Sequence, residues 1–134
     1  MQNVLTWKSG LAFEGKSESG FSINLGIGEN ASGPGPMELM ALAVGGCTGM
    51  DVASILEKKR QQVSALEVRV HTEQAETYPK IWTSVLIEYI VTGTDIDPAA
   101  VERAIELSAT KYCPAQNVVN KSVEIEHSYQ IIAG

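Results

Sequence analysis

The sequence has little positive charge. Its 134 residues contain 10 Lys and Arg against 16 Asp and Glu, which gives a formal net charge of −6. Nucleic acids and anionic membranes are bound through basic patches. The one basic cluster, residues 58–60, suits the C-terminal end of a helix, where cations are favourable. We therefore expect no nucleic acid and no membrane among the partners of this chain.

A secretory leader is also missing, because the first fifteen residues have neither a basic start nor an apolar core. This absence predicts a cytoplasmic protein, and structural disulfides are rare in that compartment. The sequence has two cysteines, Cys47 and Cys113. In a reducing compartment two cysteines are incidental, metal-binding or redox-active. Repeats, low-complexity tracts and linkers are absent too, so we interpret residues 1–134 as a single domain.

The sequence contains no strong metal or phosphate motif. Cys47, Cys113, His71 and His127 could supply four ligands to a metal, but no two of them have the short spacing typical of a zinc site. The Gly- and Pro-rich run at 33–36 lacks the Lys-Ser/Thr that follows in a phosphate-binding loop. We therefore expect no metal and no cofactor.

A long apolar run is what the sequence does have. Residues 39–56 contain one charged side chain, Asp51, and the run is preceded by Pro36 and Glu38, which suit the first turn of a helix. A helix that is apolar on nearly all sides is buried on most of them, either in the fold or in an oligomer. A membrane span is the weaker interpretation, because Asp51 and several glycines interrupt the run.

The rest of the chain predicts an α+β protein. Period-2 alternation and turn residues predict antiparallel strands before the long helix, a hairpin after it, and a last strand near the C-terminus. A second helix begins at Pro98 with Asp97 as its N-cap, and a short helix follows Pro114. The expected strands are 3–8, 11–15, 21–27, 66–71, 80–92 and 123–131, and the second helix should end near residue 112.

Both cysteines lie in unusual local sequences. Cys113 precedes Pro114 at an expected helix start, where exposed N–H groups and nearby Lys111 should lower the pKa of its thiol. Cys47 lies among Gly45, Gly46 and Gly49, which indicates that another backbone, a second subunit or a substrate comes close. A buried, inert thiol fits each position as well. From the residues alone, these alternatives stay open.

Three motifs together resemble the family of osmotically inducible protein C and the organic hydroperoxide resistance proteins, the OsmC/Ohr family, and look closest to its YhfA-like branch. The resemblance covers essentially the whole chain. It implies the OsmC-like fold, with a long buried central helix packed against antiparallel or mixed sheets in an intertwined homodimer. The motifs are Ser-Gly-Pro-Gly-Pro-Met-Glu-Leu at 32–39, Gly-Gly-Cys-Thr-Gly at 45–49 and Lys-Tyr-Cys-Pro at 111–114.

The resemblance also implies an activity. Active members of the family are thiol peroxidases that reduce organic hydroperoxides, so the chain is expected to take part in the oxidative stress response. Cys47 matches the cysteine that attacks the peroxide, and Cys113 matches the resolving cysteine that forms a disulfide with it. The reductant would be a dithiol of the lipoyl or thioredoxin type. Whereas the local sequence favours Cys113 as the more reactive thiol, the family pattern gives first attack to Cys47.

The sequence departs from the family pattern at two supporting residues. The family has a glutamate ten residues before the first cysteine, where this chain has Met37, and Glu38 follows one position later. Glu38 remains the candidate for the catalytic carboxylate. The family's N-terminal arginine has no counterpart, since no arginine precedes Arg60. A weakly catalytic or non-catalytic protein that binds small molecules or senses redox state is therefore the alternative function.

Overall fold

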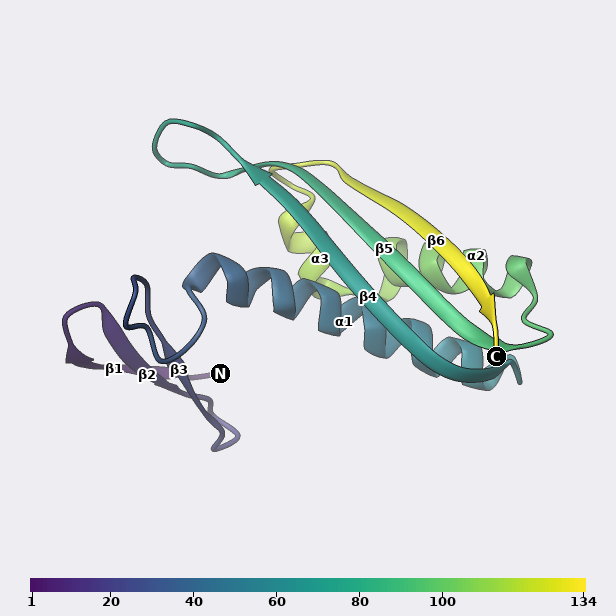
Figure 1. The fold of residues 1–134 in the computed structure, drawn as a ribbon, viewed down its shortest axis with the longest axis horizontal. Coiled ribbons are helices and arrows are strands. Elements are labelled where there is room, and N and C mark those ends of the chain that lie inside the picture. Colours follow the sequence, from purple (N-terminus) through teal and green to yellow (C-terminus); the bar gives the residue numbers. More distant parts are fainter. The chain divides into compact units, whose positions relative to one another are not determined.

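A computed structural model describes all 134 residues and has the expected α+β element order (Figure 1). The chain forms two compact units, residues 1–40 and 41–134. The interpretation as a single domain stays a prediction. The elements are β1 (Val4–Ser9), β2 (Ala12–Lys16), β3 (Ser22–Leu25), α1 (Pro36–Lys58), β4 (Gln62–Gln74), β5 (Trp82–Thr94), α2 (Pro98–Leu107), the π-helical turn η1 (Ser108–Tyr112), α3 (Pro114–Val119) and β6 (Ile125–Ala133).

The first unit is an antiparallel meander in the order β1-β2-β3, as the alternating pattern predicted. Its turns pass through Gly10 and Gly20, whose φ angles of 51° and 99° favour glycine. Large apolar side chains such as Leu5, Trp7 and Phe21 are exposed in this unit. A sheet this small buries little apolar surface by itself.

The second unit contains a mixed sheet in the order β4-β5-β6, in which β4 and β5 are antiparallel and β5 and β6 are parallel. Helices α1, α2 and α3 cover one face of this sheet (Figure 1). The central strand β5 supplies much of the core, including Ile87, Tyr89 and Val91, and Val52 of α1 and Val101 of α2 pack against it. The predicted hairpin and last strand are confirmed.

Helix α1 approaches the sheet closely because glycine faces it. A Cβ on Gly45 would lie 2.9 Å from Val70 Cγ2, and a Cβ on Gly49 would lie 3.3 Å from Val68 Cγ2. The expected close approach near Cys47 is therefore confirmed for these two glycines, and the neighbour is strand β4.

Within one chain, α1 is buried on one side, along the face that holds Val44, Thr48, Val52 and Leu56. Apolar side chains elsewhere on the helix, such as Leu42 and Met50, are exposed. Within one chain, helix α1 is therefore not buried on most of its sides, although its apolar sequence predicted such burial. By length and composition alone α1 could cross a membrane, but the core helix of a soluble protein has the same properties.

Candidate functional site

Cys113 is the N-cap of α3, as the sequence predicted. Its sulfur accepts a hydrogen bond from the Gln116 backbone N–H at 3.4 Å, and its side chain is fully buried. Burial raises the pKa of the thiol to about 11. The expected lowering of this pKa is therefore wrong. One backbone N–H at the start of a six-residue helix stabilises the thiolate less than removal from water destabilises it.

Cys47 lies on α1, is half-buried and forms no disulfide. Cys47 is near enough to Cys113 to raise the pKa of the Cys113 thiol further. The structure thus brings together two cysteines that are far apart in sequence, and both belong to the second unit. One thiol is partly open to solvent and the other is enclosed.

A π-helical turn places Cys113 beside the long helix. The sequence predicted an α-helix to about residue 112, but α2 ends at Leu107 and Ser108–Tyr112 form the wider turn η1. Within it, the Cys113 N–H donates to the Ser108 carbonyl at 2.8 Å. The extra residue of a π turn changes the direction of the chain, and such turns are frequent at functional sites. In this protein the π turn directs the Ser108 side chain toward α1, where it contacts Thr48 and Asp51.

Three buried hydroxyls and one carboxylate form a continuous hydrogen-bonded row between α1, β5 and η1. Thr48 Oγ1 lies 2.7 Å from Tyr89 Oη and 2.7 Å from Ser108 Oγ, and Ser108 donates to Asp51 Oδ2 at 2.9 Å. Burial raises the pKa of Tyr89 to about 12, and the Cys113 charge contributes to the shift. We call Tyr89, Thr48, Ser108 and Asp51 the hydroxyl chain.

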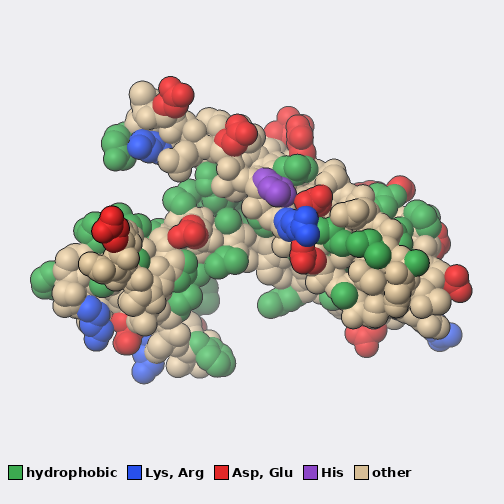
Figure 2. All heavy atoms as spheres, in the orientation of Figure 1, with side chains coloured by type: hydrophobic (Ala, Val, Ile, Leu, Met, Phe, Trp, Pro, Cys, Tyr) green, Lys and Arg blue, Asp and Glu red, His purple; other side chains and the backbone are tan.

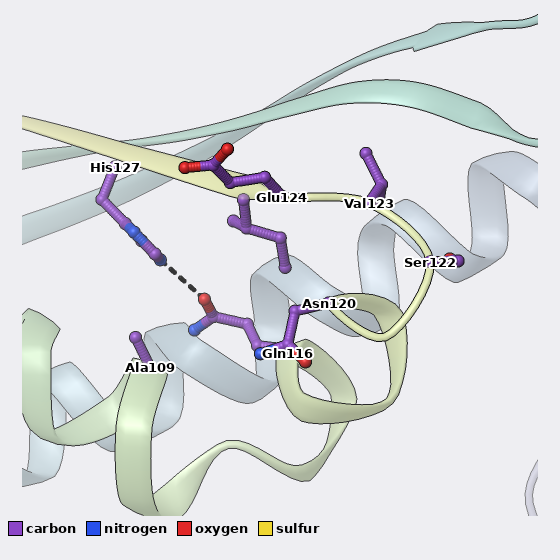
Figure 3. Close-up of a pocket in the computed structure, with 8 residues that line it drawn as sticks. Ala109, Gln116, Asn120, Ser122, Val123, Glu124 and His127 are labelled. Carbon is purple, nitrogen blue, oxygen red and sulfur yellow. Dashed lines mark hydrogen bonds between the residues drawn. The ribbon is translucent and has the colours of Figure 1, made fainter.

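Gln116 of α3 lies next to Cys113 and contacts His127 of β6 (Figure 3). His127 Nε2 lies 2.6 Å from Gln116 Oε1, so Nε2 carries the hydrogen and donates to the amide oxygen. Desolvation lowers the pKa of His127. With its oxygen held by His127, Gln116 has a buried Nε2 without a hydrogen-bond partner of good geometry. The Gln116 side chain nevertheless lies near enough to Cys113 and Tyr89 to lower the pKa of each.

An open hollow of about 520 Å³ lies beside Gln116 and His127, and its other lining residues include Asn120, Glu124 and Ile125 (Figure 3). Its volume falls in the range of small-molecule pockets. A second hollow of about 390 Å³ shares Ala109 and His127 with the first and extends along α2 and β6. Neither hollow is lined by Cys47 or Cys113.

Glu38 lies in the first turn of α1, where its Oε1 accepts the backbone N–H of Gly35 at 3.1 Å. This is the carboxylate half of a capping box, which satisfies an N–H at the helix start. Nine residues separate Glu38 from Cys47, and at 3.6 residues per turn this spacing places them on opposite sides of an ideal helix. The catalytic role of Glu38 stays a prediction.

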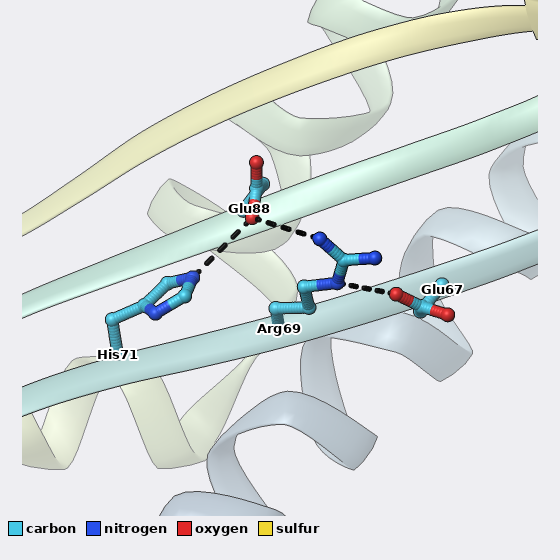
Figure 4. A network of polar contacts seen from close by, with 4 residues as sticks. All are labelled: Glu67, Arg69, His71 and Glu88. Atoms are coloured by element: carbon cyan, nitrogen blue, oxygen red, sulfur yellow. Dashed lines mark hydrogen bonds and ion pairs between the residues drawn. The ribbon is translucent and has the colours of Figure 1, made fainter.

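The two histidines lie on opposite faces of the β4-β5-β6 sheet. His71 is exposed on β4, where it contacts Glu88, and Arg69 pairs with Glu67 and Glu88 in the same network (Figure 4). Figure 2 shows this charged group with its histidine at the molecular surface. His127 instead faces the helices. The structure has no group of three or more His, Cys, Asp or Glu side chains that could hold a metal ion, and the two histidines and two cysteines form none.

Sequence reasoning missed most of the residues around the thiol pair. Thr48, Tyr89, Ser108 and Gln116 are buried polar residues from four different elements. The sequence did contain a hint of Thr48 and Asp51. Asp51 is the one charge in the apolar run, and Thr48 lies one helical turn before it. Two polar groups on one face of a buried helix indicate a polar partner elsewhere in the fold.

An α+β fold with a free thiol on a long central helix and a second thiol at the start of a short helix defines a class of two-cysteine proteins. Comparison with known proteins identifies the family. The model of the OsmC-like protein family matches residues 28–128. The chain is 43% identical to Protein YhfA of Escherichia coli K12 over 133 residues, which are 99% of each chain. The chain therefore belongs to the OsmC-like family, as its motifs indicated.

Solved structures agree with this fold. A hypothetical protein from Aquifex aeolicus VF5 is 31% identical, with a TM-score of 0.89 over 99% of this chain and 96% of that one. The organic hydroperoxide resistance protein OhrB of Bacillus subtilis is 16% identical, with a TM-score of 0.62 over 97% of this chain and 98% of its own. At that identity the likeness to OhrB concerns the fold alone.

Proposed function

We propose that this protein is a thiol-dependent peroxidase that reduces organic hydroperoxides through a cycle between Cys47 and Cys113. One observation carries the proposal, namely that a partly open thiol and a buried thiol lie next to each other in a fold that organic hydroperoxide resistance proteins share. The proposed setting is the cytoplasm, where dithiol reductants are present.

In the first step, the Cys47 thiolate attacks one peroxide oxygen and the O–O bond breaks. Cys47 becomes a sulfenic acid, and the alkoxide that leaves takes a proton to become an alcohol. Cys47 suits this role because it is the thiol that a substrate reaches from outside. Cys113, with its raised pKa and full burial, is a poor first nucleophile at neutral pH.

In the second step, Cys113 loses its proton and its thiolate attacks the sulfur of Cys47. A disulfide forms, hydroxide leaves the sulfenic acid, and with a proton it becomes water. An external dithiol of the lipoyl or thioredoxin type then reduces the disulfide to two thiols by exchange. No metal and no cofactor enter either step.

The proposal includes a homodimer, since apolar side chains of α1 and of the first sheet are exposed in one chain. An apolar pocket at the interface would favour alkyl or fatty-acid peroxides over hydrogen peroxide, because burial of an alkyl chain contributes about 0.8 kcal/mol per methylene group.

A second candidate function is small-molecule binding or redox sensing with little turnover. Two observations favour it. Glu38 is used as a helix cap, and no arginine precedes Arg60 to stabilise a thiolate from the N-terminal strands. The hollow beside Gln116 and His127 would be the place for a ligand.

Peroxide consumption in the presence of dihydrolipoamide or reduced thioredoxin tests the proposal. We expect turnover of cumene hydroperoxide by the wild-type protein, at a higher kcat/KM than with hydrogen peroxide. Cys47→Ser should abolish turnover, and Cys113→Ser should consume one equivalent and then stop. No turnover by the wild-type protein with either reductant would contradict the peroxidase and favour the second candidate.

A further inference from the structure

Ser108 takes part in hydrogen bonds on two sides. Its carbonyl, in the π turn η1, accepts the Cys113 backbone N–H at 2.8 Å. Its hydroxyl lies 2.7 Å from Thr48 Oγ1 and donates to Asp51 Oδ2 at 2.9 Å, and both of these residues belong to α1. The Ser108 hydroxyl thus makes both hydrogen bonds between α1 and η1. One residue therefore connects the segment that leads to Cys113 with the helix that carries Cys47.

The connection to Cys47 is equally short, because Thr48 is the next residue of α1. The path from one cysteine to the other consists of a peptide bond, the hydroxyl contact between Thr48 and Ser108, and the backbone hydrogen bond from Cys113 to Ser108. Both hydrogen bonds have the length of well-formed ones. The position of Cys113 relative to Cys47 therefore depends on the contact between the two hydroxyls.

The contact between Thr48 and Ser108 has one arrangement of hydrogens when Asp51 is a carboxylate. A carboxylate only accepts, so the single hydrogen of Ser108 Oγ points to Asp51. Thr48 must then donate its own hydrogen to Ser108. Thr48 and Ser108 are fully buried, so water does not compete for the contact. A buried polar contact with a single arrangement favours one position of the two elements that it joins.

We propose that Thr48 and Ser108 are positioning residues for formation of the Cys47–Cys113 disulfide. Their contact keeps η1 against α1, so that the Cys113 sulfur stays within reach of the Cys47 sulfur. In this step Cys113 loses its proton to solvent, its thiolate bonds to the Cys47 sulfur, and the group bound to Cys47 leaves with the electron pair of the broken bond. A displacement of about 1 Å between reacting groups can lower such a rate by roughly a hundredfold.

The inference rests on the proposed function, because it concerns the resolving step, but its test requires no peroxide. One equivalent of Ellman's reagent reacts with Cys47, the more accessible thiol, to form a mixed disulfide and release one thionitrobenzoate anion. Attack by the Cys113 thiolate on the Cys47 sulfur then releases a second anion and forms the Cys47–Cys113 disulfide. The second phase of absorbance therefore reports how well the two cysteines are positioned, whereas the first phase reports Cys47 alone.

Two substitutions remove the contact from either side. Ser108→Ala removes both hydrogen bonds to α1 but keeps the carbonyl that accepts the Cys113 N–H. Thr48→Val removes the Thr48 hydroxyl and keeps the shape of the side chain. We expect each to slow the second phase by at least about tenfold and to leave the first phase at its wild-type rate. Thr48→Ser keeps the hydroxyl and should retain the wild-type rate of both phases.

Two controls separate positioning from stability. Tyr89→Phe removes the bond between Tyr89 and Thr48 but keeps the contact between Thr48 and Ser108, so the second phase should keep its rate. In this Tyr89→Phe background, Thr48→Val leaves no tyrosine hydroxyl without a partner, and it should still slow the second phase. Val52→Ala removes buried methyl groups from the same helix and should lower the unfolding free energy without a change in either phase.

A second phase of wild-type rate in both Ser108→Ala and Thr48→Val would overturn the inference. Equal slowing in Val52→Ala would also overturn it, because any loss of stability would then have the same effect, and so would the absence of a second phase in the wild-type protein. Absence of peroxide turnover in a protein whose two phases respond as expected would instead contradict the peroxidase and leave the positioning role standing.

Discussion

At the scale of single residues, Cys113 shows how two opposite effects act on one thiol. Its place at the start of α3 gives the sulfur a backbone N–H, which favours the thiolate. Its complete burial favours the neutral thiol and dominates, so the pKa rises to about 11. The proposed roles of the two cysteines follow from this pKa. Cys47 reacts with the peroxide first, and Cys113 stays protonated until the disulfide forms.

This environment predicts an unusual titration. In a Cys47→Ser variant, thiolate absorbance at 240 nm should stay absent below about pH 9 and appear near pH 11, slightly lower than in the wild type because the Cys47 contribution is removed. A Cys47→Ser/Cys113→Ser variant provides the tyrosine background. A thiolate that appears near pH 7 would contradict the assignment of burial as the dominant effect.

The same shift predicts a loss of stability at high pH. The folded chain keeps the Cys113 proton up to about pH 11, whereas the unfolded chain loses it near 9, so the unfolding free energy falls between these values. A shift of two pKa units corresponds to a free-energy change of roughly 3 kcal/mol. Urea unfolding from pH 8 to 11 should show a smaller fall for Cys113→Ser than for the wild type. If the unfolding free energies of the two proteins fell in parallel with pH, the raised pKa of Cys113 would be contradicted.

At the scale of elements, the start of α1 depends on Glu38. Its side chain satisfies the Gly35 N–H, so Glu38→Ala should lower the unfolding free energy by about 1 kcal/mol. Glu38→Gln keeps an acceptor and should lose less, because glutamine also serves in a capping box. Chemical denaturation measures both, with Glu57→Ala on the exposed part of the same helix as the control.

The same two variants also address the catalytic prediction for Glu38. If Glu38 acts only as a cap, Glu38→Gln oxidises at Cys47 at the wild-type rate. A large fall in that rate without loss of stability would assign the carboxylate to the chemistry, as the family resemblance implies.

Helix α1 packs closely against strand β4 at Gly45, where there is no room for a larger side chain beside Val70. Gly45→Ala adds a methyl group 2.9 Å from Val70 Cγ2, and we expect a net destabilisation of about 1 kcal/mol even though alanine favours helix. In a Val70→Ala background the same change should stabilise, because the conflicting methyl groups are gone. Thermal unfolding of the wild type, the two single variants and the double variant measures the sign of both effects. If Gly45→Ala destabilised the protein in both backgrounds, the close contact between Gly45 and Val70 would be contradicted.

The sequence was informative where structure is local. Alternation predicted the strands, and Pro36, Asp97-Pro98 and Cys113-Pro114 predicted three helix starts within a residue. The π turn at Ser108–Tyr112 was missed, because one inserted residue leaves the helical pattern nearly unchanged. The hydroxyl chain was missed because the residues that its hydrogen bonds join are 41 to 60 positions apart, so only tertiary packing brings them together.

At the scale of the whole molecule, the exposed apolar side chains predict a second copy. Leu42 and Met50 on α1 are 65% and 76% exposed in one chain, although they belong to the most apolar run of the sequence. Leu42→Glu and Met50→Glu should therefore turn a dimer into a monomer in light scattering. Val118→Glu changes an equally exposed residue of α3 and is the control. A wild-type monomer would contradict the homodimer.

The measurement that tests the central claim most directly is the intact mass of the reduced protein after one equivalent of cumene hydroperoxide, and separately of hydrogen peroxide, followed by peptide mapping. The account predicts rapid loss of two hydrogens and a Cys47–Cys113 link, faster with the organic peroxide. Thiols that stay unchanged, or slow overoxidation of a single cysteine, would contradict a peroxidase cycle and favour a binding or sensing role.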